Sequence, residues 1–202
     1  MKLICIGRNY VKHIEELGNE KPESPIIFLK PDSALIKNNE PFYYPDFSTN
    51  IHYEVEVLVK IKKVGKSIPV NFAHKYYDEI GLGIDLTARD LQTKAKAKGL
   101  PWDLAKGFNG SAPISNFISK STFNVQDLNF SLKLDGTLVQ SSNTSLMLWS
   151  IDEIIAYVSQ YMTLKKGDIL FTGTPEGVGP IKIGDQLQGF IESQNMFDFE
   201  IR

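Results

Sequence analysis

Several kinds of site are excluded by what this sequence of 202 residues has little of. Its single cysteine, Cys5, rules out an intramolecular disulfide framework and a cysteine zinc cluster. Three histidines are too few for a histidine-rich metal site. The 22 basic residues are outnumbered by 24 acidic ones, which disfavours a nucleic-acid partner, because such domains usually carry a basic excess. A metal in this protein would therefore be held mainly by carboxylates.

Targeting and membrane segments are also missing from the sequence. No apolar run approaches the roughly 18 residues of a membrane span. The first seven residues are too short for the apolar part of a signal peptide. We therefore expect a cytoplasmic protein that does not act at a membrane. In that compartment Cys5 stays reduced, and its apolar neighbours favour a buried strand residue over a nucleophile.

Short strands with turn residues between them dominate the pattern, so we predict a β-rich α+β fold in one domain, residues 1–202. The predicted strands are Lys2–Ile6, Pro25–Leu29, Ile51–Ile61, Glu79–Asp85, Leu128–Leu134, Thr137–Gln140, Asp168–Thr172, Gln186–Ile191 and Met196–Ile201. Helices are predicted at Tyr10–Leu17, from Thr87 to Lys98, and after Ser150.

Local signals mark the ends of several of these elements. Asp135 and Gly136 suit a type I′ turn between two strands. Ser150 and Glu153 form a capping box before an apolar helical stripe. Gly99 is expected to end the second helix, because glycine readily adopts the left-handed conformation that follows a helix.

The strand Ile51–Ile61 carries two glutamates on its polar face. Glu54 and Glu56 are two residues apart, so both side chains leave the sheet on the same side, about 7 Å apart at the backbone. By itself this spacing is more typical of a solvated sheet face. Asp85 ends an apolar strand, where a buried, unpaired carboxylate would be costly, although a charge at a helix N-terminus is the alternative. Together the three carboxylates predict a site for Mg²⁺, Mn²⁺ or Ca²⁺.

Polar and cationic residues follow these carboxylates. Arg89 and Gln92 share one face of the predicted helix. Lys106 lies in an aromatic stretch, where it either reaches the surface or supplies a fixed positive charge beside an anion. The loop after Phe171 is rich in Gly, Thr and Pro, which is typical either of a simple turn or of a rigid loop that binds a carboxylate.

Five motifs occur together and in order over most of the chain. They are Gly7-Arg-Asn-Tyr10, Glu54-Val-Glu56, Gly83-Ile-Asp85 to Arg89-Asp-Leu-Gln92, Leu100-Pro-Trp102 with Lys106-Gly-Phe108, and Thr172-Gly-Thr-Pro with Gly177-Val-Gly179. In this arrangement the sequence resembles the fumarylacetoacetate hydrolase family, in particular its short acylpyruvase and oxaloacetate decarboxylase branch. The resemblance implies a mixed β-sheet roll, a homodimer, and a Mg²⁺ or Mn²⁺ ion bound by Glu54, Glu56 and Asp85.

The resemblance also implies a mobile lid at residues 10–20 that carries a His13–Glu16 pair. Three residues apart on a helix, these side chains can hydrogen-bond, so that Glu16 orients His13 as a general base. A plain exposed helix is the alternative. The predicted catalytic residues are His13, Glu16 and Lys106. The predicted substrate-binding residues are Arg8, Arg89, Gln92, Thr172, Gly173 and Thr174.

The implied reaction is Mg²⁺-dependent hydrolysis of a C–C bond in an acylpyruvate, through a pyruvate enolate held at the metal. A small 2-oxo acid or dicarboxylate is the expected substrate. Decarboxylation of oxaloacetate and isomerisation of a related 2-oxo dicarboxylate use the same enolate and stay open as alternatives. A family member that binds metal and dicarboxylate without turnover is a third alternative, although every proposed catalytic position holds a competent residue.

Overall fold

Four β-sheets form the framework of the computed structural model, which describes all residues from 1 to 202. The largest sheet has the strand order β2 (Ile26–Lys30), β1 (Leu3–Gly7), β12 (Ile169–Phe171), β5 (Val55–Ile61), β6 (Tyr77–Ile84) and β9 (Ile118–Ser119). The second has the order β11 (Thr137–Asn143), β10 (Asn129–Leu134), β14 (Gln186–Ile191) and β15 (Gln194–Glu200).

Two smaller sheets complete the strand framework. One has the order β13 (Gly179–Pro180), β4 (Ile51–Tyr53) and β7 (Thr87–Ala88), and the other pairs β3 (Leu35–Ile36) with β8 (Ala112–Pro113). The β1–β12 and β3–β8 pairs are parallel and the other pairs are antiparallel, so the sheets are mixed. The predicted β-rich α+β fold with a mixed β-sheet roll is confirmed.

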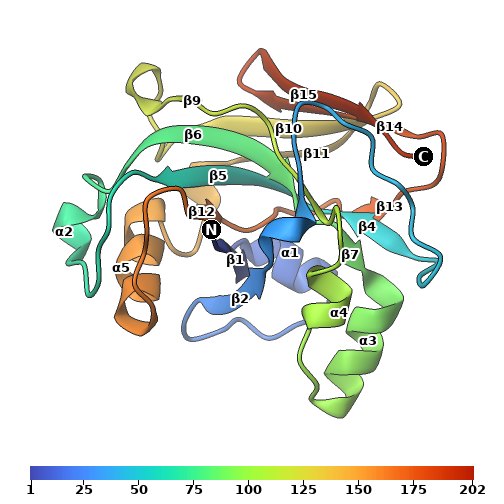
Figure 1. The fold of residues 1–202 in the computed structure, drawn as a ribbon, viewed down its shortest axis with the longest axis horizontal. Coiled ribbons are helices and arrows are strands. Elements are labelled where there is room, and N and C mark those ends of the chain that lie inside the picture. Colours follow the sequence, from blue (N-terminus) through green and yellow to red (C-terminus); the bar gives the residue numbers. More distant parts are fainter.

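Helices are short and lie around the sheets (Figure 1). They are α1 (Val11–Glu16), α2 (Val70–Ala73), α3 (Arg89–Lys98), α4 (Asp103–Lys106) and α5 (Ile151–Tyr161), with single 3₁₀ turns at Asp32–Ala34, Lys120–Thr122 and Thr144–Leu146. The capping box at Ser150 and Glu153 is formed. Gly99 follows α3 with φ 63°, as the sequence predicted.

The core divides between the two ends of the β5–β6 pair. Val55 and Val57 pack beneath the four-stranded sheet, whereas Val59 and Ile61 pack with α5. Figure 1 shows the same division, with the four-stranded sheet over one end of β5 and β6 and with α2 and α5 at the other. The opposite face of β5 carries Glu56 and Leu58, and both are buried. Both faces of this strand are therefore covered.

Two predicted elements differ from the structure. The strand predicted over Ile51–Ile61 divides at Glu54, because β4 leaves the large sheet to pair with β7 and β13 while β5 stays in it. The helix predicted from Thr87 begins at Arg89, because Thr87 and Ala88 pair with β4 instead. In both places pairing with a distant strand outweighs the local pattern.

Turn chemistry was predicted more accurately. Asp135 and Gly136 have φ values of 49° and 78°, and the positive sign of both fits the predicted type I′ turn. The hairpin that they connect extends to Asn143, three residues beyond the predicted end of its second strand.

Candidate metal centre and active site

Three buried carboxylates lie together where β5 and β6 end. The antiparallel register places Val55 opposite Ile84, so that Asp85 lies next to Glu54, and the Asp85 N–H donates to the Glu54 carbonyl at 2.8 Å. Glu56 projects from the same face of β5. One oxygen from each of these carboxylates lies within 4.8 Å of the others, and each residue is at most 5% exposed. The structure thus brings together the three predicted ligands.

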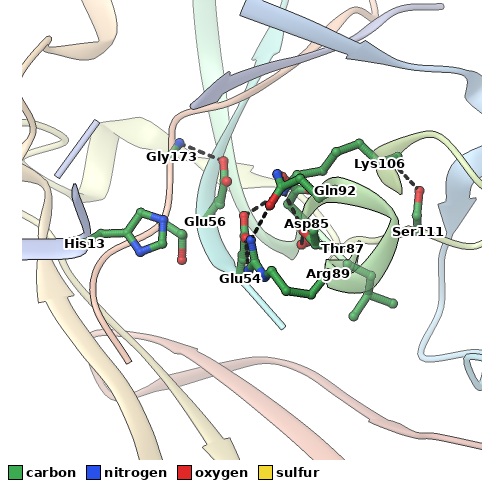
Figure 2. Close-up of polar contacts among 12 residues, drawn as sticks. His13, Glu54, Glu56, Asp85, Thr87, Arg89, Gln92, Lys106, Ser111 and Gly173 are labelled. Atoms are coloured by element: carbon green, nitrogen blue, oxygen red, sulfur yellow. Dashed lines mark hydrogen bonds and ion pairs between the residues drawn. The ribbon is translucent and has the colours of Figure 1, made fainter. Parts of the chain in front are cut away.

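Two cationic side chains neutralise Glu54. The Lys106 ammonium, on α4, lies 2.8 Å from Glu54 Oε2 and 2.6 Å from Asp85 Oδ2. Arg89 Nη2 donates to Glu54 Oε1 at 2.6 Å (Figure 2). Burial alone would raise the pKa of Glu54, but Lys106 and Arg89 hold this pKa well below its usual range. Lys106 is itself buried, so it supplies a fixed positive charge and does not reach solvent.

Glu56 differs from Glu54 because no cationic side chain forms an ion pair with it. Its Oε2 accepts the Gly173 N–H at 2.7 Å. Burial and the neighbouring charge of Asp85 raise the pKa of Glu56 well above its usual value. A buried carboxylate without a counter-ion, next to two others, is the arrangement that a divalent cation with oxygen ligands would neutralise. The donor set therefore fits a divalent metal.

A second buried lysine, Lys30, supports the other side of Asp85. Its ammonium lies 2.7 Å from Asp85 Oδ1 and donates to the carbonyls of Leu86, at 3.1 Å, and of Ser111, at 3.0 Å. It also contacts the Lys106 carbonyl. Sequence reasoning missed this residue. Its only sequence signal is a charged side chain directly after the apolar strand residues 25–29, the same pattern that identified Asp85.

The predicted lid pair is formed on α1. His13 Nδ1 lies 3.2 Å from Glu16 Oε2, and the other oxygen of Glu16 accepts the Gly177 N–H at 3.0 Å. His13 is 5% exposed and lines the pocket above the carboxylates, whereas Glu16 lies behind it. Figure 2 shows His13 on the side of Glu56 away from Lys106. The arrangement allows Glu16 to orient the imidazole toward a ligand in the pocket.

Most of the other predicted substrate-binding residues surround the same pocket. Arg8 and Thr174 line it, together with Arg89 and Gln92, which are joined by a 2.6 Å hydrogen bond. Gly173 acts through its N–H on Glu56. Thr172 is placed differently: its hydroxyl donates to a strand carbonyl at 2.8 Å, and its side chain does not line the pocket.

Further pocket residues were not singled out from the sequence. Phe28 and Trp102 form an edge-to-face aromatic pair with ring centroids 5.9 Å apart. Lys96, on α3, lies at the pocket with its ammonium 5.7 Å from the centre of the Trp102 ring. Lys96 has the local pattern of a solvated helix residue, so only the fold identifies it as a pocket residue.

Family comparison agrees with this geometry. The family model described as the fumarylacetoacetate (FAA) hydrolase C-terminal domain matches residues 2–202. This chain belongs to the fumarylacetoacetate hydrolase family.

Similar proteins carry names that describe related reactions. The mitochondrial oxaloacetate tautomerase FAHD1 of Bos taurus is 40% identical over 200 residues, covering 98% of this chain and 90% of the relative. The structure of fumarylpyruvate hydrolase from Pseudomonas aeruginosa, in complex with Mn²⁺ and pyruvate, has a TM-score of 0.94 at 34% identity and covers 100% of this chain and 89% of its own. The 2-hydroxyhepta-2,4-diene-1,7-dioate isomerase from Mycobacterium marinum has a TM-score of 0.87 at 32% identity, covering 99% and 73%.

None of the five helices has the length and apolar character needed to cross a membrane. The cytoplasmic location stays a prediction, since the similar Bos taurus protein is named as mitochondrial.

Proposed function

We propose that this protein is a metal-dependent enzyme of enolate chemistry whose main reaction is the keto–enol tautomerisation of oxaloacetate. The observation that supports this proposal most strongly is the buried group Glu54, Glu56 and Asp85 facing a histidine–glutamate pair across one pocket. The similarity to oxaloacetate tautomerases at about 40% identity favours this substrate over others of the same type.

Glu54, Glu56 and Asp85 would hold Mg²⁺ or Mn²⁺, and the Mn²⁺ of the similar Pseudomonas aeruginosa structure favours a metal of this kind. When bound, the cation supplies a Lewis acid for the carboxylate and 2-oxo oxygens of the substrate. The Lys106 ammonium lies beside the same carboxylates and stabilises negative charge on the 2-oxo oxygen electrostatically.

His13 carries the proton in this proposal. It removes a proton from C3 of the keto form, and the C–H electron pair moves into the C2–C3 bond while negative charge develops on the 2-oxo oxygen. The protonated His13 then gives this proton to that oxygen, which completes the enol and restores the neutral imidazole. Glu16 is hydrogen-bonded to Nδ1 of His13 and thereby keeps the other ring nitrogen, Nε2, directed at the substrate. Residues 10–20 act as a lid, since α1 has no side-chain cap and contacts the loop after β12 through Glu16.

A second reaction uses the same residues, namely the hydrolysis of acylpyruvates that the sequence predicts. The His13–Glu16 pair favours it, because a general base next to the pocket can take a proton from water. The hydroxide equivalent attacks the distal carbonyl, the C–C bond breaks, and the electron pair leaves as pyruvate enolate. Protonation at C3 gives pyruvate and a carboxylic acid. Decarboxylation of oxaloacetate forms the same enolate without water.

A substrate panel tests the proposal. Purified protein with Mg²⁺ or Mn²⁺ is assayed against the enol form of oxaloacetate, fumarylpyruvate and acetylpyruvate, with a chelator-treated sample as control. We expect the highest kcat/KM for oxaloacetate tautomerisation and loss of all activities with the chelator. A higher kcat/KM for an acylpyruvate would make hydrolysis the main reaction. Failure to turn over any of the three would contradict the proposal.

The homodimer implied by the family resemblance is also a proposal. Tyr43 and Phe47 support it, because both are more than half exposed on one apolar surface region. Light scattering on a sizing column should give twice the mass of one chain, and a single-chain mass at micromolar concentration would contradict it.

A further inference from the structure

Two cationic side chains at the pocket have no acidic partner. Arg89 and Lys106 form ion pairs with the carboxylates, but neither Arg8 nor Lys96 forms one with any residue. Arg8 Nη2 instead donates to the neutral amide oxygen of Asn19 at 2.9 Å. The pocket lining thus has four cationic side chains against three carboxylates. A divalent cation on the carboxylates would add further positive charge, so the pocket can accept more than one negative charge from a ligand.

Helix α3 places Lys96 further out than the carboxylates. Arg89, Gln92 and Lys96 occupy positions i, i+3 and i+7, so they lie on one face of the helix and all three line the pocket. Arg89 reaches Glu54 at the base. Lys96 comes seven residues later, about 10 Å further along the helix axis. The Phe28–Trp102 pair also lines the pocket, and the Lys96 ammonium lies over the Trp102 ring.

Arg8 comes to the pocket from a different element. It directly follows β1 and has φ 59°, a left-handed conformation that is unfavourable for a residue other than glycine. The hydrogen bond to Asn19 holds its guanidinium, and both side chains line the pocket. Burial and the charges of Arg8 and Arg89 lower the pKa of Lys96, which indicates that these cations lie close enough to repel one another. An anion bound between them would relieve that repulsion.

We propose that Arg8 and Lys96 bind the second carboxylate of the substrate and thereby select 2-oxo dicarboxylates over 2-oxo monocarboxylates. This inference rests on the proposed function, because it assumes that the first carboxylate and the 2-oxo oxygen bind at the base. The carbon chain between the two carboxylates then passes the aromatic pair. Lys96 and Arg8 are specificity-determining residues, and neither takes part in proton transfer.

Fumarylpyruvate and acetylpyruvate form a matched substrate pair, since both are acylpyruvates and only the first has a distal carboxylate. In Lys96→Gln we expect kcat/KM for fumarylpyruvate to fall by about ten- to a hundredfold, the effect of losing one charge-assisted hydrogen bond. The loss should appear mainly as a higher KM, because such a contact holds ground state and transition state equally. For acetylpyruvate, kcat/KM should change by less than about threefold.

Three further variants complete the experiment. Lys94→Gln removes another exposed charge of the same helix that does not line the pocket, and it should leave kcat/KM unchanged for both substrates. Lys96→Arg keeps the charge and should restore most of the fumarylpyruvate activity. Arg8→Gln, like Lys96→Gln, should lower kcat/KM for fumarylpyruvate and leave it nearly unchanged for acetylpyruvate. Circular dichroism checks that the variant is folded.

The outcomes separate this inference from the proposed function. If the wild-type protein turns over neither the acylpyruvates nor oxaloacetate, the proposed function itself is wrong. If it turns over any of them, the distal-carboxylate role is overturned when Lys96→Gln lowers kcat/KM for neither oxaloacetate nor fumarylpyruvate, or lowers it equally for acetylpyruvate.

Discussion

The base and the lid of the pocket are built very differently. At the base, Glu54 and Asp85 are buried, and three cations from β2, α3 and α4 hold them within 2.8 Å. The proposed lid, residues 10–20, contains the six-residue helix α1, which has no side-chain cap. Its links to the loop after β12 are the Glu16–Gly177 hydrogen bond and a 3.5 Å ion pair between Lys12 and Glu176. Lys12 is 72% exposed, so this ion pair contributes at most about 1 kcal/mol.

The difference separates two tasks in space. In the proposed function, the groups that bind charge and polarise a substrate belong to the base, where ion pairs hold Glu54 and Asp85 and a backbone N–H holds Glu56. His13 and Glu16, which we propose to carry the proton, lie instead on the short helix α1, which has no side-chain cap. Opening of the proposed lid would move His13 away from the pocket, whereas Glu54, Glu56 and Asp85 lie on or next to β5 and β6 and would stay in place. Changes at the base should affect metal binding and folding, and changes in the lid should affect turnover alone.

The largest effect is expected from the double change Glu54→Gln and Glu56→Gln. Without two of its three carboxylates the site should no longer bind Mn²⁺ in calorimetry, and activity should fall by at least about a thousandfold, as expected when a Lewis acid is lost. A lid variant, His13→Ala, serves as control and should bind Mn²⁺ as the wild type does. Unchanged Mn²⁺ affinity in the double variant would refute these ligands.

The next effect concerns folding. Lys30→Met removes a fully buried cation and leaves Asp85 with one partner fewer, so we expect a loss of about 3–5 kcal/mol in the free energy of unfolding. Urea denaturation measures it. Adding Asp85→Asn should recover part of the loss, because the uncompensated charge disappears. Lys98→Met, an exposed change at the end of α3, should cost less than about 0.5 kcal/mol. Equal losses in the two lysine variants would show that the buried ion pair does not stabilise the base.

A change in the proposed lid should lower activity and leave the stability unchanged. His13→Ala should lower kcat for acylpyruvate hydrolysis by about a hundredfold or more, since a general base typically contributes that much. Oxaloacetate decarboxylation should fall less, because it needs no attacking water. The urea midpoint should stay within the error of the wild-type value. A similar loss in hydrolysis and decarboxylation would argue against His13 as the base that activates water.

The base of the site could be predicted from local patterns and the lid pair only from family resemblance. Glu54 and Glu56 have the two-residue spacing of one strand face, and Asp85 ends an apolar strand, so local rules identify all three. The family was predicted correctly from five ordered motifs. His13 and Glu16 have no such signal, because their segment reads as an ordinary polar helix.

Residues whose roles depend on distant contacts could not be predicted. Lysines are mostly solvent-exposed. Lys30 has only the signal of a charge after an apolar strand, which does not predict its ion pair with Asp85, and Lys96 has no local signal of its place at the pocket. Thr87 was expected to lie in the first turn of a helix. It lies in β7 instead, where its hydroxyl accepts a hydrogen bond from Lys106 at 2.5 Å. Thr172 was expected to contact the ligand, yet its hydroxyl donates a hydrogen bond to the strand carbonyl of Val57.

The smallest effect concerns His52, which lies on β4 two residues before Glu54, at low pH. Burial and the charge of Arg89 lower the pKa of His52 to about 4, whereas an unfolded histidine titrates near 6.5. Between these values the unfolded state binds more protons, so stability is lost as the pH falls through this window. Because His52 is only half-buried, solvent screening reduces the effect to about 1 kcal/mol. Urea denaturation of metal-free protein at pH 7 and pH 5 should show a smaller pH-dependent loss in His52→Gln than in the wild type. The raised pKa of Glu56 is common to both proteins, so the difference between them isolates His52. Identical losses would mean that burial and Arg89 do not keep His52 neutral in the folded protein.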